Sequence, residues 1–191
     1  MNNISFKIAD IYDISNEDKN VILEFYRNLF IKMYKEDILD KYLKNSRKKV
    51  IDGYLTDDLN IFGNKLDKGL KEEFILIYQN DSLIGASRLR NFYEDYCLLV
   101  DVATSNLTSE EYREIYTKLV MFIENYLQKI NIFKLYVAIP KFDPVILCKM
   151  SELDYVEDPD DISLEEDLVY MYNKCLERKK CEEFNSSSKQ R

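Results

Sequence analysis

Apolar and polar residues follow strand and helix periods in turn along the first third of the chain. ISFKIAD (4–10) alternates apolar and polar residues, which is typical of a strand with one buried face. After Ser15, an expected N-cap, apolar residues recur at helical spacing as far as Met33. A second helix is predicted from Asp37 to Val50. The polar stretch 53–69, which holds three of the four glycines, is predicted to be an irregular connection.

The middle of the chain predicts a hairpin followed by a central strand. FILIYQ and LIGASRLRNF are β-rich runs joined by Asn80-Asp81, a pair that favours a tight turn. The run from Leu98 to Ala103 is nearly continuous apolar sequence, interrupted by Asp101. Such a run predicts a strand that is covered on both faces.

The second half alternates helical and strand patterns. An apolar stripe predicts a long helix from Ser109 to Ile130, followed by a buried strand in IFKLYVAI (132–139). Asp143 as N-cap and Pro144 at the first helical position predict a helix that reaches Leu153. DLVYMYNKCL (167–176) alternates and predicts the last strand.

This order, β-α-α-β-β-β-α-β-α-β, predicts an α/β fold with one mixed sheet flanked by helices. The length of 191 residues favours a single domain, which we place at residues 1–176. The polar tail 177–191 is expected to be flexible.

Composition limits the class of protein. Hydrophobic residues make up 46% and charged residues 32%, and no apolar run approaches the length of a membrane span. The N-terminus lacks the features of a signal peptide, so we expect a cytoplasmic protein without a membrane partner. The net charge of -8 disfavours nucleic-acid binding. It could attract a cationic substrate such as an amine, or it could serve solubility alone.

The titratable residues limit the chemistry. The chain has no histidine, which excludes Ser-His-Asp and Cys-His catalysis and removes the commonest metal ligand. Its four cysteines form neither a CxxC pair nor a zinc spacing, so we expect reduced thiols and no metal. Proton transfer would fall to Asp, Glu, Tyr, Cys or Lys side chains or to the backbone.

The order of elements resembles that of the GNAT acyltransferases, enzymes that move an acyl group from coenzyme A to an amine. SLIGASRLR is similar to the second and third strands of that family, VILCKMSELDYVED to its late helix, and DLVYMYNKCL to its closing strand. The resemblance extends from about Ile4 to Leu176. It implies a GNAT-like mixed sheet, acetyl-CoA or another acyl-CoA as cosubstrate, and a small amine or a protein amino group as acceptor.

The family signature Q/R-x-x-G-x-G/A is altered at the start of the long helix. When the signature is matched on Arg113, its two glycine positions become Tyr116 and Lys118. The glycines of the family let backbone N–H groups approach the pyrophosphate of coenzyme A, with help from the helix dipole. Tyr116 should block this approach, whereas Lys118 could supply a compensating charge as a point contact.

The same helix is predicted to cap itself. Thr108 and Glu111 fit a capping box, with Thr108 as N-cap and Glu111 at N3. Glu110, Glu111 and Glu114 place three carboxylates in the first turns, where they would repel a phosphate. The local sequence therefore favours a self-contained helix end over an anion site.

Three residues are candidates for catalysis under the resemblance. The family often uses a late-helix tyrosine to protonate the leaving thiolate, but the matching position here is Met150. Cys148 or Tyr155 could replace that acid, and a buried packing role is the alternative for both. Asp101 could be the base that deprotonates the amine. Its alternatives are an ion pair with an arginine of the preceding strand, or a partly wet strand end.

Two functional hypotheses follow. In the first, the strands at 97–104 and 132–139 receive the pantetheine arm through backbone groups, including those of Val102 and Thr104, and the amine attacks the thioester directly. In the second, a catalytically inactive GNAT-like binding or regulatory module has lost acyl-CoA binding, and a homodimer is one form it could take. An unrelated α/β protein is a third reading.

Overall fold

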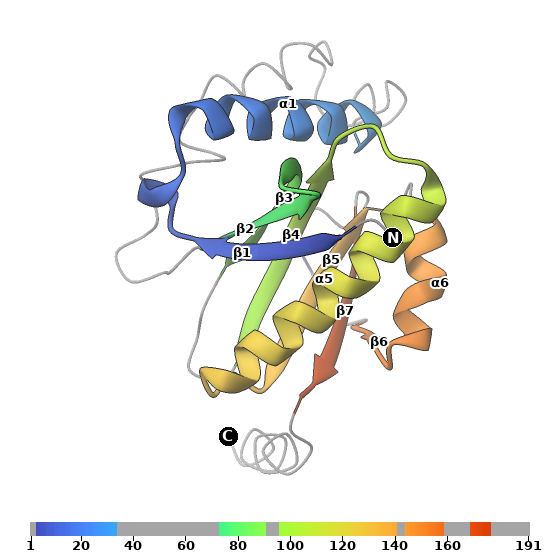
Figure 1. The fold of residues 1–191 in the computed structure, drawn as a ribbon. Coiled ribbons are helices and arrows are strands. Elements are labelled where there is room, and N and C mark those ends of the chain that lie inside the picture. The colour runs from blue at the N-terminus through green and yellow to red at the C-terminus, as the bar shows by residue number, and fades with distance from the viewer. Residues whose placement is uncertain (1–2, 34–72, 91–95, 141–143, 159–168, 177–191) are drawn as a thin grey trace, which may run out of the picture. The chain divides into compact units, whose positions relative to one another are not determined.

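The computed structural model describes residues 3–33, 73–90, 96–140, 144–158 and 169–176 (Figure 1). The helix predicted at 37–50, the connection at 53–69, the N-cap Asp143 and the tail 177–191 lie outside these residues. The chain divides into two compact units, which we describe in turn. One comprises residues 1–88 and 101–108, and the other residues 89–100 and 109–191.

The first unit combines a helix with four strand segments. They are β1 (Ile4–Ala9), a 3₁₀ turn η1 (Ile11–Asp13), α1 (Asn16–Met33), β2 (Glu73–Gln79), most of β3 (Ser82–Arg90) and the later half of β4 (Tyr96–Thr104). β1 pairs antiparallel with β2 from Ile4 opposite Gln79 to Ala9 opposite Phe74. The predicted alternation of the first strand is confirmed from Ile4 to Ile8, where residues are in turn less and more exposed.

Two short-range predictions in this unit are confirmed. The backbone N–H of Asp18 donates to Ser15 Oγ at 3.0 Å, and Ser15 Oγ donates to Asp18 Oδ2 at 2.9 Å. The bond from the Asp18 N–H to the Ser15 hydroxyl is an N-cap, and it starts α1 where the sequence predicts. At the hairpin, Asn80 and Asp81 adopt φ values of 48° and 65°. Positive φ at both central residues is the type I′ geometry that suits a two-residue hairpin.

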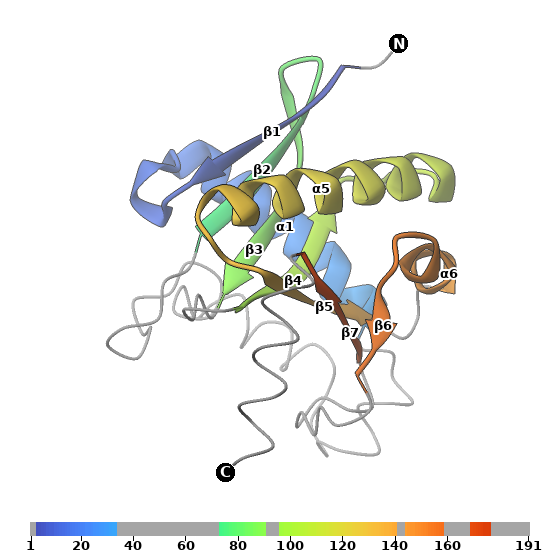
Figure 2. The same cartoon turned by 90° about the horizontal axis from the view of Figure 1, so that it is seen from below.

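The second unit holds the parallel part of the fold. It comprises the first half of β4, then α5 (Ser109–Lys129), β5 (Lys134–Pro140), α6 (Pro144–Glu152), β6 (Val156–Glu157) and β7 (Val169–Cys175). β4 pairs parallel with β5, and β5 pairs antiparallel with β7. α5 is the crossover between the two parallel strands, and α5 and α6 lie side by side (Figure 2).

The strands of the described residues follow the order β1-β2-β3-β4-β5-β7-β6. Parallel and antiparallel pairs occur in one sheet, so the predicted mixed α/β class is confirmed. β6 was not predicted, because two residues are too short to show an alternating pattern. In the described part of the chain, no helix is long and apolar enough to cross a membrane.

The core of the second unit follows from the periodicity of its elements. Leu135, Val137 and Ile139 occupy alternate positions of β5 and are fully buried. One face of α5 is also buried, through Ile115, Tyr116, Leu119, Val120, Ile123 and Leu127. These positions recur every three or four residues, so the helical stripe predicted from the sequence is the packed face of α5.

Candidate functional site

The first turns of α5 contain the residues matched to the pyrophosphate signature. α5 begins at Ser109, directly after Thr108, which agrees with the predicted N-cap position. Glu110 and Glu111 lie in its first turn. The helix dipole favours carboxylates in this turn, as it would favour any other anion.

The three signature positions have different environments. Tyr116 is 3% exposed and belongs to the core, with its ring 6.2 Å from that of Tyr112. Lys118 Nζ donates to Glu114 Oε1 at 2.6 Å, in an exposed pair one helical turn apart. Arg113 is exposed. These residues do not reproduce a glycine cradle, and the side chains of Arg113 and Lys118 are both exposed.

Val102 and Thr104 lie in the later half of β4, within the first unit. Val102 is buried and Thr104 is half-buried. Just beyond the strand, the N–H of Ser105 donates to the carbonyl of Ile84 at 2.8 Å, which ties this end of β4 to β3. The backbone of β4 is therefore held on its β3 side as far as the end of the strand.

The parallel ladder between β4 and β5 is shorter than either strand. It runs from Tyr96 opposite Lys134 to Leu99 opposite Val137. β4 continues to Thr104 and β5 continues to Pro140, where it stays paired with β7. Beyond Leu99 and Val137, β4 and β5 therefore continue outside their shared ladder.

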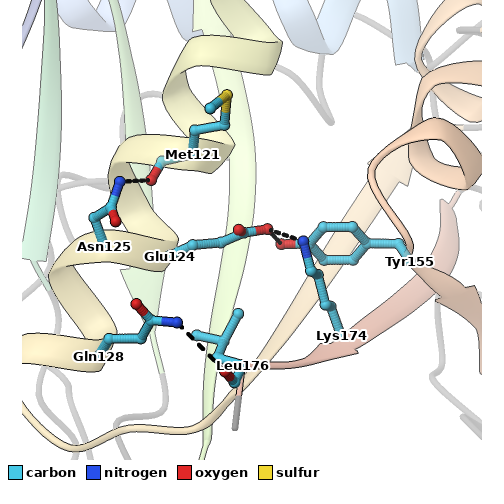
Figure 3. A network of polar contacts seen from close by, with 7 residues as sticks. All are labelled: Met121, Glu124, Asn125, Gln128, Tyr155, Lys174 and Leu176. Carbon is cyan, nitrogen blue, oxygen red and sulfur yellow. Dashed lines mark hydrogen bonds and ion pairs between the residues drawn. The ribbon is translucent and has the colours of Figure 1, made fainter. Parts of the chain in front are cut away.

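Tyr155 belongs to a partly buried polar network centred on Glu124 of α5 (Figure 3). The Tyr155 hydroxyl donates to Glu124 Oε1 at 3.0 Å, and Lys174 Nζ of β7 donates to the same oxygen at 3.0 Å. The side chains of Lys174 and Glu124 are 23% and 18% exposed, and Tyr155 is 4% exposed. The Glu124 carboxylate of α5 therefore contacts two other parts of the chain. These are the segment that follows α6, through Tyr155, and β7, through Lys174.

The register of the strands explains why Lys174 reaches α5. Lys174 pairs with Leu135 across the β5–β7 ladder, and directly opposed residues project from the same face of a sheet. Leu135 is buried in the core of this unit. Lys174 therefore projects from the face that carries the buried side chains, and its charge is balanced there by Glu124.

The environment of Tyr155 raises the pKa of its hydroxyl well above the usual range. Burial is the largest cause, followed by the charge of Glu124, the hydrogen bond to Glu124 and the proximity of Tyr116. The phenol thus keeps its proton, which it donates in the hydrogen bond to Glu124. The Tyr155 hydroxyl is therefore engaged by Glu124 in this structure.

A second contact holds the end of β7 against α5. Gln128, one helical turn after Glu124, donates from Nε2 to the carbonyl of Leu176 at 3.3 Å (Figure 3). The N–H of Leu176 donates to the carbonyl of Phe133 at 2.6 Å. The side chain of Gln128 on α5 therefore holds Leu176, the residue that follows β7.

The late helix supplies no proton donor at the position matched to the family tyrosine. Met150 is fully buried, and its carbonyl accepts a hydrogen bond from the N–H of Tyr155 at 3.0 Å. Asp154 adopts a φ of 63°, the left-handed conformation that favours glycine. The side chains of Cys148 and Asp101 are outside the described part of the structure.

The expectation of reduced thiols is wrong for one cysteine. Cys175 is disulfide-bonded, and its partner is not among the described side chains. Cys97 is a free, buried thiol whose Sγ lies 3.4 Å from the carbonyl oxygen of Arg90. Within the described residues, no group of three Cys, Asp or Glu side chains is arranged to hold a metal ion.

Glu124 and Lys174 were not predicted from the sequence as members of a polar network. Glu124 lies eight residues, or about two helical turns, after Tyr116 on the buried side of α5, where a carboxylate is unexpected. A carboxylate at a buried position of a helix is the feature of the sequence that could have indicated this network. Its partners are 31 and 50 residues away, so the sequence alone does not identify them.

The fold was compared with proteins of known sequence and structure. No protein-family model and no curated protein matches the sequence. A GNAT-family acetyltransferase of Staphylococcus aureus Mu50 matches 91% of this chain and 100% of its own, with 18% identity and a TM-score of 0.57. A putative GNAT-family acetyltransferase of Desulfovibrio desulfuricans matches 92% and 100%, with 8% identity and a TM-score of 0.56.

The chain has the GNAT fold. The PaiA N-acetyltransferase of Thermoplasma acidophilum, solved in complex with coenzyme A, matches 90% of this chain and 99% of its own, with 16% identity and a TM-score of 0.54. The GNAT scaffold predicted from element order and short motifs is confirmed. At these identities the likeness establishes the fold and leaves the activity to be argued from the residues.

Proposed function

We propose that the protein transfers an acyl group from acyl-CoA to an amine. The GNAT fold supports this proposal, because several structures that share it were solved with the relevant ligand. PaiA of Thermoplasma acidophilum contains coenzyme A, and a GNAT-family acetyltransferase of Elizabethkingia anophelis contains acetyl-CoA. The acceptor would be a small amine or a protein amino group, and the chain would act in the cytoplasm.

The observation that carries the proposal is the short β4–β5 ladder. Beyond Leu99 and Val137 the two strands continue past their shared hydrogen bonds. A pantetheine arm contains amide groups, which can pair with a strand edge in the manner of an added strand. Backbone recognition of this kind, at Val102 and Thr104 among others, needs no particular side chain. It would therefore survive the loss of sequence motifs.

The pyrophosphate would need a different contact from the glycine cradle. Tyr116 is packed in the core, and the first turn of α5 is acidic. We assign the pyrophosphate contact to the exposed guanidinium of Arg113, which can bind phosphate oxygens in a bidentate manner. Lys118 could contribute once it leaves Glu114, and that exposed pair is weak enough to exchange.

Catalysis would rest on orientation of the amine against the thioester, without a covalent enzyme intermediate. Asp101 stays our candidate for the base, and Cys148 for the group that protonates the thiolate. For Tyr155 we propose a structural role, because its hydroxyl is donated to Glu124. An amine that binds in its neutral form would not need to be deprotonated, so its acylation would depend less on Asp101.

Thermal unfolding in the presence of ligand tests the proposal. Acetyl-CoA at about 100 times its Kd should stabilise the protein by about 2.7 kcal/mol, which moves the midpoint by several degrees. Free coenzyme A should give a similar shift, and Arg113→Gln should reduce both. Arg27→Gln is the matched control, because Arg27 is a partly exposed arginine of α1 that pairs with Glu24. An unchanged midpoint at millimolar acetyl-CoA would contradict the proposal.

A second candidate function is a GNAT-like module without catalysis. The glycine-free, acidic start of α5 favours it, as does the buried Met150 at the position of the family tyrosine. In that case neither acetyl-CoA nor coenzyme A would change the midpoint. An amine screen that detects released thiol would also stay negative.

A further inference from the structure

Gly85 lies at a point where β3 and β4 approach closely. A Cβ atom added to Gly85 would lie 2.8 Å from the carbonyl oxygen of Ala103, 3.0 Å from Thr104 Cγ2 and 3.2 Å from Ile77 Cδ1. The first distance is shorter than a normal carbon–oxygen contact, and its partner is backbone. A rotamer change cannot relieve it, so any side chain at position 85 would displace β4.

The surroundings of Gly85 leave little room for that displacement. Gly85 is buried, and the adjacent hydrogen bond from Ser105 N–H to the Ile84 carbonyl fixes the register of β3 and β4. Glycine in a strand interior costs conformational entropy and packs no side chain. Its presence inside β3 is therefore explained by the approach of the β4 backbone.

The close approach of Gly85 to Ala103 lies in the part of β4 that would bind the pantetheine arm under the proposed function. Ala103 lies between Val102 and Thr104, and all three lie past the β4–β5 ladder, which ends at Leu99. The position of these backbone groups is set from the β3 side, because that is the side on which β4 is held.

We propose that Gly85 is a positioning residue for the cosubstrate. By lacking a side chain it lets β4 lie close to β3, and so it places the backbone of Val102–Thr104 where the pantetheine arm is bound. This inference rests on the proposed acyl-CoA function. It adds a residue that contacts no ligand itself and acts through the β4 backbone.

The test compares Gly85→Ala with Ala86→Gly. Each variant changes one methyl group at neighbouring buried positions of β3, and both should lower the unfolding midpoint. Gly85→Ala alone should displace the β4 backbone. A displacement of a few tenths of an ångström to 1 Å should reduce kcat/KM for acetyl-CoA by about 10- to 100-fold, while KM for the amine changes little.

A fragment of the cosubstrate separates positioning from general destabilisation. Adenosine 3′,5′-bisphosphate lacks the pantetheine arm, so its Kd should be the same for wild type and Gly85→Ala, while the Kd of coenzyme A rises about tenfold or more. If Gly85→Ala does not fold, Gly85→Ala combined with Ile77→Val is measured instead. The shorter side chain removes the Cδ1 contact and gives β3 room to adjust.

The outcomes separate the two proposals. Wild-type protein that binds neither acetyl-CoA nor coenzyme A overturns the acyl-CoA function itself. Wild-type protein that binds both, together with a Gly85→Ala variant that binds coenzyme A as tightly as Ala86→Gly does, overturns the positioning role alone. A loss of coenzyme A affinity specific to Gly85→Ala, with unchanged binding of the bisphosphate, supports it.

Discussion

At the scale of single residues, Glu124 illustrates how a partly buried charge is kept. Its Oε1 atom accepts hydrogen bonds from both Tyr155 and Lys174 at 3.0 Å. Desolvation of a carboxylate and an ammonium is unfavourable, and the close pairing with an additional donor offsets it. Replacing either Glu124 or Lys174 should therefore lower the free energy of unfolding by more than the pair contributes to it. The reason is that the other charge stays partly buried.

Two glutamates of the same helix allow this to be tested. Glu124→Gln should lower the free energy of unfolding by about 1–3 kcal/mol, because Lys174 loses its charged partner in a half-buried place. Glu114→Gln removes the exposed pair with Lys118 and should cost less than about 0.5 kcal/mol. Urea denaturation of both variants provides the comparison. Equal losses would show that the network contributes no more than a surface pair.

The raised pKa of Tyr155 predicts a specific dependence of stability on pH. Above the pKa of an unfolded tyrosine, near 10, the unfolded chain releases this proton while the folded protein keeps it. The stabilisation is therefore fully present below about pH 10 and declines as the pH rises further. Tyr155→Phe should be less stable at neutral pH by about 1 kcal/mol and should lose less stability between about pH 9.5 and 11.

Urea midpoints across that pH range measure the difference. Tyr78, whose pKa is also raised by burial and by the charge of Asp18, is present in both proteins and cancels in the comparison. Parallel pH profiles for wild type and Tyr155→Phe would argue against a buried, protonated Tyr155.

At the scale of elements, helix starts follow local rules. The Ser15–Asp18 pair starts α1, and α5 starts directly after Thr108 as the sequence predicts. The start of α5 matters for function, because an acidic helix end is a poor site for a phosphate. The same local features that make the helix stable remove the glycine cradle of the family.

The cap of α5 can be located by substitution. Thr108→Ala should lower the free energy of unfolding by about 1 kcal/mol, whereas Ser109→Ala should change it by less than about 0.5 kcal/mol. Thermal and urea unfolding would measure both. A larger loss for Ser109→Ala would move the N-cap by one residue and would contradict the predicted capping box.

At the scale of the whole molecule, the chain combines a GNAT fold with an acidic composition. The net charge is -8, from 35 acidic and 27 basic residues. Such a charge attracts cations over the distance that salt leaves unscreened, about 10 Å at 0.1 M. If the acceptor is a cationic amine, this attraction should increase the rate at which the amine associates with the protein, and so kcat/KM.

Ionic strength should therefore change the reaction with one class of acceptor. We expect kcat/KM for a polyamine or another cationic amine to fall several-fold between about 0.02 and 0.3 M salt, because screening weakens the attraction. An amine that carries a compensating carboxylate is the control and should respond much less. An identical response of both acceptors would show that the acidic surface serves solubility alone.

The sequence by itself determined those features that depend on neighbouring residues. The apolar stripe of α5, the alternation of β1, the Ser15 cap and the tight turn at Asn80-Asp81 all follow from short-range periodicity and local hydrogen bonding. The order of the predicted elements, together with three short motifs, was enough to predict the GNAT fold by resemblance.

Only the tertiary structure shows the surroundings of Tyr155 and Gly85. Tyr155 is 31 residues from Glu124, and Lys174 is 50 residues from it, so their meeting depends on sheet register and helix packing rather than on any local motif. The closeness of Gly85 to Ala103 likewise arises from the pairing of β3 with β4. Local patterns set the period of each element, whereas long-range packing determines which side chains it brings together.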